Sequence, residues 1–247
     1  MIYLKPKGQR AHNNVIKTPD WPIAFQEQAF IAQDPRLKYY YQAGADTGDT
    51  PLADVSFVAM DFETTGLDVS KHDIVSIGLV PFDLKRIRCK ESRHWIISPS
   101  TPLVEQSVVI HGITHSDVNN APDLTAILEP LLECLAGRII VVHHRTIERS
   151  FLNAALRARI NEGIMFPVVD TMDLEARLHR LKPMGFWSRL TGKPPVSIRL
   201  ADSRRRYGLP DYPPHHALTD ALATAELLQA QIAYRFGPDT PLADIWR

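Results

Sequence analysis

Two acidic residues, Asp61 and Glu63, follow a run of apolar and small side chains within residues 55–67. Such a run predicts a buried strand, and residues two positions apart on a strand point to the same face. The two carboxylates can therefore converge on one hard cation. Charge at the end of a buried strand is costly unless it is compensated, which favours a metal here. By itself the Asp-x-Glu spacing is a weak signal, because it also occurs in exposed strands and turns.

The residues after this pair, Thr64, Thr65 and Gly66, predict a turn that ends the strand. Glycine lets the backbone come close to a ligand, and the threonines offer hydroxyl groups and amide donors. We therefore expect a polar loop over the metal.

Three residues that could complete this site lie far downstream. Glu148 lies just inside an expected helix that follows the apolar run 138–143, and His215 precedes Asp220 by five residues at the start of the last expected helix. Strand ends and helix starts gather at one edge of an α/β sheet, so these side chains can meet the first pair. Several carboxylates at one place need a counter-charge to stay ionised, which predicts one or two divalent cations.

The pattern of apolar residues predicts an α/β fold with a mixed sheet flanked by helices. After the strand within 55–67, strands are expected over 73–83, 94–97, 138–143 and 166–170. Helices are expected over 121–137, 146–161, 171–181, 201–207 and 217–236. Short connections between the first three strands predict antiparallel hairpins, whereas the later helical connections predict crossovers.

Residues 1–50 are interpreted as an N-terminal helical extension, with a polar, mildly basic arm over 1–17. Two short helices are expected between residues 18 and 44, because Thr18 and Asp34 each place a capping residue before a proline. Three consecutive tyrosines, Tyr39 to Tyr41, are assigned to packing. The main domain is expected over 51–237, followed by a C-terminal tail over 238–247.

The charge balance limits how a polyanion can be held. Twenty-eight basic residues offset twenty-eight acidic ones, so a nucleic acid would need a local basic surface. Arg199 and the run Arg204, Arg205 and Arg206 shortly before His215 predict a basic lip beside the site. For this run of arginines, a helix face exposed to solvent is the equally simple alternative. Residues 182–200, which contain three prolines, predict an irregular flap.

The cysteine spacing and the length of the apolar runs indicate the cellular compartment in which the protein is expected. Cys89 and Cys134 show no CxxC spacing, so neither a disulfide scaffold nor a thiolate zinc site is indicated, and a cytoplasmic location is expected. The chain contains no run of about 18 apolar residues and no apolar stretch of the signal-peptide kind at its start, which argues against a membrane or secreted protein.

Taken in order, these motifs resemble those of the DEDDh family of 3′→5′ exonucleases, relatives of the proofreading subunit of bacterial DNA polymerase III. The similar segments are 61–67 (first motif), 74–78 (second strand), 111–114 (His-Gly-Ile-Thr), 170–171 (Asp-Thr) and 215–221 (third motif). The resemblance covers roughly residues 55–231. It implies a ribonuclease H-like fold with a mixed five-stranded sheet.

The second motif departs from the family pattern. Residues 143–152 align without gaps with His-Asn-Ala-x-Phe-Asp-x-x-Phe-Leu and place Glu148 at the usual aspartate. Glutamate keeps the charge and adds one methylene, so it could still reach a metal or its water. His144 and Arg145 replace the usual Asn and Ala, and Arg145 and Arg149 are candidates for phosphate contacts. The alternative is a catalytically weakened nucleic-acid-binding module in which Glu148 is a surface residue.

The resemblance implies two Mg²⁺ or Mn²⁺ ions about 4 Å apart at the scissile phosphate of a DNA or RNA 3′ end. Their ligands would be Asp61, Glu63, Glu148 and Asp220. His215 would be the general base, and the product would be a nucleoside 5′-monophosphate. A zinc hydrolase with histidine ligands is a further alternative, although an oxygen-rich cluster suits Mg²⁺ or Mn²⁺ better.

The resemblance also assigns residues to substrate binding. The terminal nucleotide would be held by Thr64, Thr65, Gly66 and Leu67, with Leu67 against the last base. His111, Gly112 and Ile113 would line the neighbouring wall, and His144 and Arg145 would lie near the phosphates. No residues that would bind a polymerase are recognisable.

Overall fold

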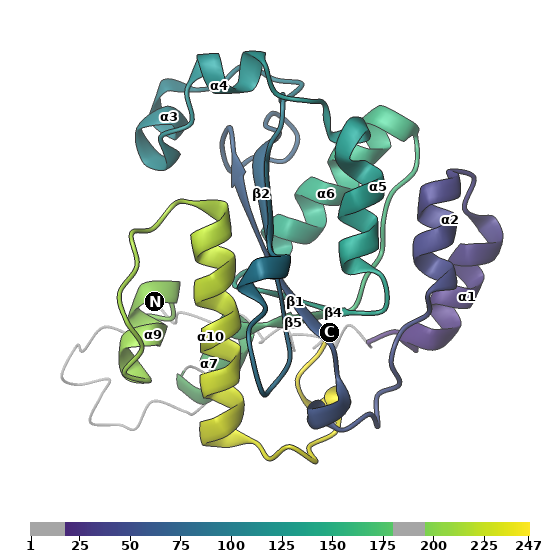
Figure 1. The fold of residues 1–247 in the computed structure, drawn as a ribbon, viewed down its shortest axis with the longest axis vertical. Helices are drawn as coiled ribbons and strands as arrows, with labels where there is room; N and C mark the ends of the chain where they lie inside the picture. Colours follow the sequence, from purple (N-terminus) through teal and green to yellow (C-terminus); the bar gives the residue numbers. More distant parts are fainter. Residues whose placement is uncertain (1–17, 180–195) are drawn as a thin grey trace, which may run out of the picture.

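A five-stranded mixed sheet forms the centre of the structure, a computed structural model that describes residues 18–179 and 196–247 (Figure 1). The strands are β1 (Phe57–Thr64), β2 (Ile74–Phe82), β3 (Arg93–Ile96), β4 (Ile139–Val142) and β5 (Val168–Asp170), in the order β3-β2-β1-β4-β5. β1 pairs with β2, and β2 with β3, in antiparallel fashion, whereas β1–β4 and β4–β5 are parallel. The predicted change from hairpins to helical crossovers is confirmed.

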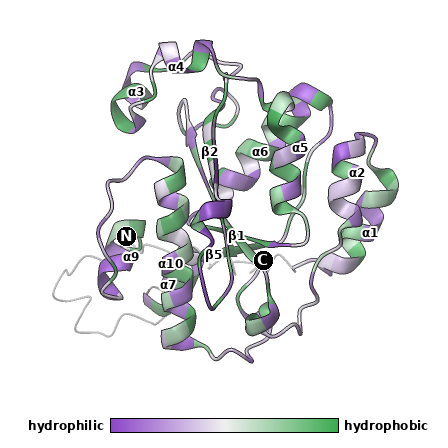
Figure 2. Cartoon of the chain, in the orientation of Figure 1, coloured by the Kyte–Doolittle hydropathy of each residue, from purple (hydrophilic) through white to green (hydrophobic). Residues whose placement is uncertain are grey.

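Helices cover both faces of this sheet (Figure 1). On one side lie α5 (Leu124–Leu135) and α6 (Arg145–Ile160), and on the other α7 (Thr171–His179), α9 (Leu200–Arg206) and α10 (Ala217–Arg235). The helices carry both hydrophobic and hydrophilic residues in Figure 2, as expected for helices that bury one side. None of the helices in the described ranges combines the length and hydrophobicity needed to span a bilayer.

The start of α10 approaches the sheet closely at Gly78 of β2. A Cβ atom at Gly78 would lie 2.3 Å from the carbonyl carbon and oxygen of Ala217, so a larger residue would force the helix away. Glycine therefore permits this approach. It places the residues that precede and open α10, including His215 and Asp220, beside the end of β1.

Two short helices, α3 (Glu105–His111) and α4 (His115–Asn119), lie above the start of β2 in Figure 1 and were not predicted from the sequence. α3 ends at Gly112, whose φ of 73° is a left-handed conformation that suits glycine. α4 begins with a capping box between Thr114 and Asp117. These caps end α3 and begin α4 within a few residues of each other, and the resulting turn brings His111 toward the end of β1.

The predicted N-terminal helices are α1 (Trp21–Ile31) and α2 (Pro35–Gln42), and they belong to the main core. Tyr40 and Tyr41 are buried as expected for packing residues, whereas Tyr39 is 64% exposed. The guanidinium of Arg149 lies 5.6 Å from the centre of the Trp21 ring. The Glu162 carboxylate, just after α6, accepts hydrogen bonds from the backbone N–H groups of Gln33 and Asp34, which precede α2.

The last residues are not a tail, in contrast to the prediction for 238–247. Leu242, Ile245 and Trp246 are buried in the core, and the backbone of Arg247 exchanges hydrogen bonds with Val168 of β5. The segment covers the open edge of the sheet, which a short edge strand such as β5 otherwise exposes. The predicted arm over 1–17 and most of the predicted flap over 182–200 lie outside the described residues.

Candidate active site

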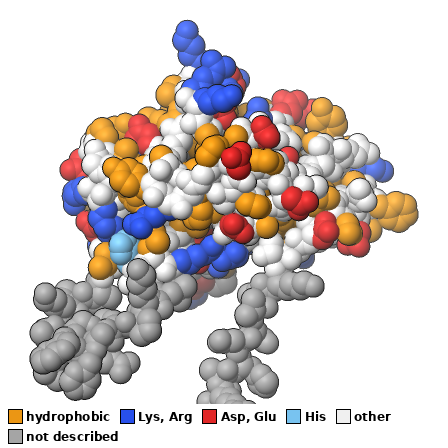
Figure 3. Space-filling view, turned by 90° about the horizontal axis from the view of Figure 1, so that it is seen from below, with side chains coloured by type: hydrophobic (Ala, Val, Ile, Leu, Met, Phe, Trp, Pro, Cys, Tyr) orange, Lys and Arg blue, Asp and Glu red, His pale blue; other side chains and the backbone are white. Residues whose placement is uncertain are grey.

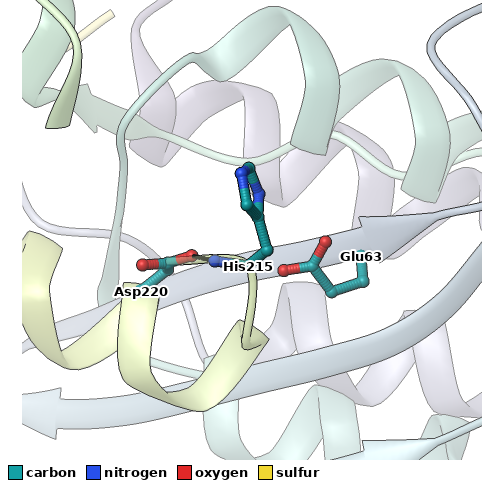
Figure 4. A group of neighbouring side chains, drawn as sticks. All are labelled: Glu63, His215 and Asp220. Carbon is teal, nitrogen blue, oxygen red and sulfur yellow. Dashed lines mark hydrogen bonds between the residues drawn. The ribbon is translucent and has the colours of Figure 1, made fainter. Parts of the chain in front are cut away.

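Four acidic side chains gather where β1 ends, beside the starts of α6 and α10. They are Asp61, Glu63, Glu148 and Asp220. The pKa of Asp61 is raised well above its usual value, first by burial and then by repulsion from the other three acids. Glu63, His215 and Asp220 each bring a possible ligand atom within 4.8 Å of the others (Figure 4). The structure therefore joins residues that are far apart in the sequence.

Burial and mutual repulsion disfavour the ionised forms of these acids. Burial, together with repulsion from Asp220, raises the pKa of Glu63 to about 7, and burial and repulsion from Asp170 raise that of Glu148 to about 8. The pKa of Asp220 is also raised by burial. Such shifts mean that the ionised carboxylates are poorly stabilised by their surroundings. A bound cation would stabilise the ionised forms and lower these pKa values.

Glu148 supplies the sharpest sign of a missing partner. It is only 4% exposed, and its Oε2 atom is buried without a hydrogen-bond partner among the described residues. Buried polar atoms in native proteins are nearly always satisfied, so an unsatisfied carboxylate oxygen inside an acidic cluster fits a hard cation. Glu148 is thus not the surface residue that the alternative interpretation of the second motif required.

The two adjacent histidines before α10 have different surroundings. The backbone N–H of His215, at a φ of 67°, donates to Asp220 Oδ2 over 2.8 Å, while its ring is exposed (Figure 4). His216 caps α10, and its ring packs against His94 with centroids 4.7 Å apart. His216 therefore has a structural role, whereas the His215 ring is free to reach a ligand at the cluster.

A cavity of about 640 Å³ opens beside the carboxylates, and we call it the loop pocket. Its lining includes Asp61, Glu63, Thr64, Thr65, Gly66, Leu67, His111, His215 and Asp220. Leu67 is 82% exposed at its rim. The volume is in the range of small-ligand sites. The predicted residues of the first motif and His111 thus share one pocket with the acidic cluster.

A buried network holds the loop of this pocket. Thr65 N–H donates to the Asp73 carbonyl over 2.9 Å, and Asp73 N–H donates to Thr65 Oγ1 over 3.0 Å. The Asp73 carboxylate accepts from both Ser100 and Arg159, each over 2.7 Å. The loop is therefore fixed before any ligand binds.

His111, which lines the loop pocket, carries a buried donor without a partner among the described residues. Its Nδ1 accepts the Ile113 N–H over 3.1 Å, so in the neutral ring Nε2 carries the proton. That Nε2 is buried and has no partner in the described part of the chain. Gly112 and Ile113 line a neighbouring cavity of about 230 Å³ together with His111, Glu63 and His215, and their contact with substrate stays a prediction.

His144 and Arg145 do not line the loop pocket, and their contact with the substrate stays a prediction. His144 is exposed at the start of α6. Arg145 donates to Asp170 from both its backbone, over 3.1 Å, and its side chain, over 3.2 Å. Arg149 donates to the carbonyls of Phe166 and Arg247. The arginines of the second motif thus serve internal contacts.

The predicted basic lip also needs correction. Arg204 is buried and donates to Ala223, Pro210 and Glu226. Arg206 pairs with the buried Glu175, and Arg205 with Asp202 and Asp211. Arg199 is exposed and lines a cavity beside Asp61 and Asp220, whereas Arg205 and Arg206 are exposed but ion-paired. The described residues on the face in Figure 3 likewise mix basic and acidic side chains.

Several lining residues carried no recognisable signal in the sequence. In the loop pocket these are Val104, Gln106, Ser107, Ile110 and Ile147. Most of them belong to α3 or its start, and seven residues are too few to show a clear helical period. The capping glycine Gly112 was the one available hint.

A mixed five-stranded sheet with an acidic cluster at the end of its central strand is a ribonuclease H-like nuclease architecture. The chain belongs to the exonuclease family, whose model, described as Exonuclease, matches residues 58–228. Enzymes of this family generally use divalent metal ions, and the acidic cluster suits that requirement.

Two of the relatives are named as DNA polymerase III proteins. Over 179 residues, the chain is 30% identical to a DNA polymerase III PolC-type of Thermotoga maritima, covering 72% of this chain but 12% of that protein. Over 180 residues it is 28% identical to the DNA polymerase III subunit epsilon of Treponema pallidum, covering 73% of this chain and 78% of that one. The chain thus spans only a small part of the PolC-type relatives.

Solved structures support the fold. Exonuclease X in complex with 5′ overhanging duplex DNA is 22% identical, with a TM-score of 0.57, and covers 76% of this chain and 98% of that chain. The nuclease domain of 3′hExo, a DEDDh family member bound to rAMP, is 15% identical with a TM-score of 0.57. The match covers 73% of this chain and 92% of that chain.

Proposed function

We propose that this protein is a metal-dependent 3′→5′ exonuclease that releases nucleoside 5′-monophosphates from single-stranded DNA or RNA ends. The observation that carries the proposal is a cluster of four carboxylates, three of which, Asp61, Glu63 and Asp220, line the loop pocket. The direction is favoured by the resemblance of the motifs and by neighbours whose names include 3′-exonucleases.

Asp61, Glu63, Glu148 and Asp220 would hold two Mg²⁺ or Mn²⁺ ions. When bound, these ions would neutralise charge on the scissile phosphate and lower the pKa of the attacking water. Oxygen donors in this number suit hard cations, whereas a zinc site of histidines would need ligands that the cluster does not bring together.

The chain's own residues would bind and orient the terminal nucleotide. Thr64 to Leu67 form one wall of the loop pocket, and the exposed Leu67 side chain offers an apolar contact to the last base. The unsatisfied Nε2–H of His111 can donate to a sugar or phosphate oxygen. Because the loop is fixed by Asp73, little ordering cost remains when a nucleotide binds.

His215 would act as the general base. Its exposed imidazole takes a proton from the attacking water, which adds to phosphorus while the 3′ oxygen of the preceding nucleotide leaves. The phosphate remains on the released nucleotide as a 5′-monophosphate. The backbone bond from His215 to Asp220 keeps the ring beside the cluster.

One specific feature favours a second candidate, a nucleic-acid-binding module with weakened catalysis. Glu148 stands where the family pattern has aspartate, and an added methylene changes the reach of the carboxylate. This candidate predicts binding to 3′ ends with little turnover.

The test is the degradation of 5′-labelled single-stranded DNA and RNA in Mg²⁺ or Mn²⁺. We expect a ladder that shortens from the 3′ end, absent in Asp61→Asn. His215→Ala is expected to lower kcat by about 10²–10⁴-fold with a smaller change in KM. His115→Ala, an exposed histidine that does not line the loop pocket, is the control. If wild type binds both strands but cleaves neither, the binding module replaces the exonuclease.

A further inference from the structure

The ring of His94, in β3, packs against the residue that follows His215. The centres of the His94 and His216 rings lie 4.7 Å apart, with an angle of 41° between their planes. His94 does not line the loop pocket. We propose that His94 is a positioning residue, which holds the imidazole of His215 beside the acidic cluster by fixing His216. This inference rests on the proposed exonuclease function.

The sheet leaves room for the start of α10 directly beside His94. Gly78 of β2 lies opposite His94 of β3, and opposite residues of antiparallel strands point to the same face of a sheet. Because Gly78 has no side chain, the backbone of Ala217 fits over it; a Cβ atom there would lie 2.3 Å from the Ala217 carbonyl. The start of α10 therefore packs on Gly78 with the His94 ring at its side.

Ser76 fixes the orientation of the His94 ring. The Ser76 hydroxyl and His94 Nε2 are joined by a hydrogen bond of 2.8 Å. Ser76 is buried in β2 two residues before Gly78, so its side chain points to the same face of the sheet. Turning the ring away would leave a buried hydroxyl without this partner, which is unfavourable. The position of the His94 ring is therefore set by the sheet.

His216 passes this position on to His215. His216 caps α10, since its Nδ1 accepts the Thr219 N–H over 3.4 Å, so its ring contacts both His94 and the first turn of the helix. The preceding residue, His215, has a φ of 67°, which is uncommon for a residue with a side chain. Such a conformation persists only where its surroundings hold it. Fixing His216 therefore fixes the direction in which the His215 side chain leaves the backbone.

The same turn also holds one carboxylate of the cluster. The backbone N–H of His215 donates to Asp220 Oδ2 over 2.8 Å. A displacement of His215 would therefore disturb Asp220 as well. The proposed base and one proposed metal ligand depend together on the packing of His216 against His94.

A direct contact between His94 and the substrate is the competing explanation, because His94 lines the 230 Å³ cavity together with His111 and His215. Both explanations predict that loss of the His94 ring slows cleavage. They differ in whether the effect passes through His215. A double-mutant cycle separates them, because residues that act through one another have non-additive effects.

The test measures kcat and KM for cleavage of a 5′-labelled single strand in Mg²⁺ or Mn²⁺. We expect His94→Ala to lower kcat about tenfold, the upper end of what one contact between rings contributes, with little change in KM. In the His215→Ala background, His94→Ala should have no further effect. His94→Phe, which keeps a ring against His216, should recover most of the loss. Arg93→Ala is the matched control, because the side chain of this exposed neighbour in β3 points to the opposite face of the sheet.

An unchanged kcat in His94→Ala, a loss confined to KM, or the same tenfold loss in the His215→Ala background would overturn the inference while leaving the exonuclease intact. If wild type cleaves no strand, the proposed function fails first.

Hydrogen exchange then tests the positioning role without activity. The backbone amides of His215 and Thr219, which donate to Asp220 and His216, should exchange about fivefold faster in His94→Ala than in Arg93→Ala. In His94→Phe they should exchange as in wild type. Equal exchange in His94→Ala and Arg93→Ala would overturn the positioning role.

Discussion

Two glutamates in this protein, Glu148 and Glu175, are both buried but have different surroundings. Glu175 is fully buried, and although burial opposes its charge, hydrogen bonds from Gln231, Arg206 and Tyr207 lower its pKa. Glu148 is 4% exposed, and burial raises its pKa to about 8. Burial alone thus does not reveal the role of an acid; what matters is whether its oxygens are satisfied.

This difference in hydrogen bonding distinguishes Glu175, which holds helices together, from Glu148, which belongs to the candidate active site. Glu175 of α7 accepts from Tyr207 over 2.9 Å and from Gln231 of α10 over 2.9 Å, so it joins α7, the end of α9 and α10. These helices are therefore held by a completed network. Glu148 lies at the edge of the cluster that a cation would complete.

The largest effect is expected for Glu175→Ala, which leaves Arg206 and the neighbouring donors without their acceptor. Breaking a buried ion pair from one side costs about 3–5 kcal/mol, and the loss should not depend on metal. Urea unfolding with and without Mg²⁺ measures it. Glu133→Ala, an exposed glutamate, is the control. A loss below about 1 kcal/mol would mean that the network contributes little.

Glu148→Gln should separate activity from stability. Removing its charge is expected to lower exonuclease activity at least about 100-fold, because losing a metal ligand should cost more than losing a hydrogen-bonding partner of such a ligand, which costs about 10–100-fold. The metal-free protein should be as stable as wild type or more so, because folding no longer has to protonate this carboxylate, whose pKa burial raises to about 8. Activity assays and urea unfolding on the same preparation, with Glu133→Gln as control, provide the measurement. Retained activity would mean that three carboxylates suffice.

The stability of the metal-free protein should fall as pH rises. The folded protein holds protons on Glu63 and Glu148 up to pKa values of about 7 and about 8, against an ordinary value of 4.5. The stabilising contribution is complete below pH 4.5 and is lost as pH rises through 7 to 8, by at most about 1.4 kcal/mol for each pKa unit. Unfolding between pH 5 and 8 should show this fall, and saturating Mg²⁺ should reduce it. Identical profiles with and without Mg²⁺ would contradict a cation site.

The smallest effect is expected for Arg145→Ala. Arg145 is held by Asp170 over 3.2 Å and does not line the loop pocket, so KM for single-stranded DNA should change less than about threefold. Titration of the substrate with the variant and with wild type provides the comparison. A much larger rise in KM would restore Arg145 to the phosphate-binding role that its position in the motif predicted.

Much of the fold could be predicted because its signals are local. The apolar run before Asp61 predicts β1, and the stripe of leucines in 124–135 predicts α5, since period and burial act within one element. Asp61, Glu63, His215 and Asp220 could be named from spacing within their own segments. α3, α4 and the packed C-terminal segment could not, because the first two are too short for a period and the third depends on contact with β5.

The amino-acid sequence alone determined which residue types stand at the end of β1 and the starts of α6 and α10, and so the kind of chemistry available. Whether each charge is satisfied was settled by tertiary contacts. The Gln231 side chain donates a hydrogen bond to Glu175, which lies 56 residues away along the chain, and the Arg145 side chain donates one to Asp170, which lies 25 residues away. Hydrogen bonds act over about 3 Å in space whatever their separation along the chain, so only the folded chain shows that Glu175 is complete and Glu148 is not.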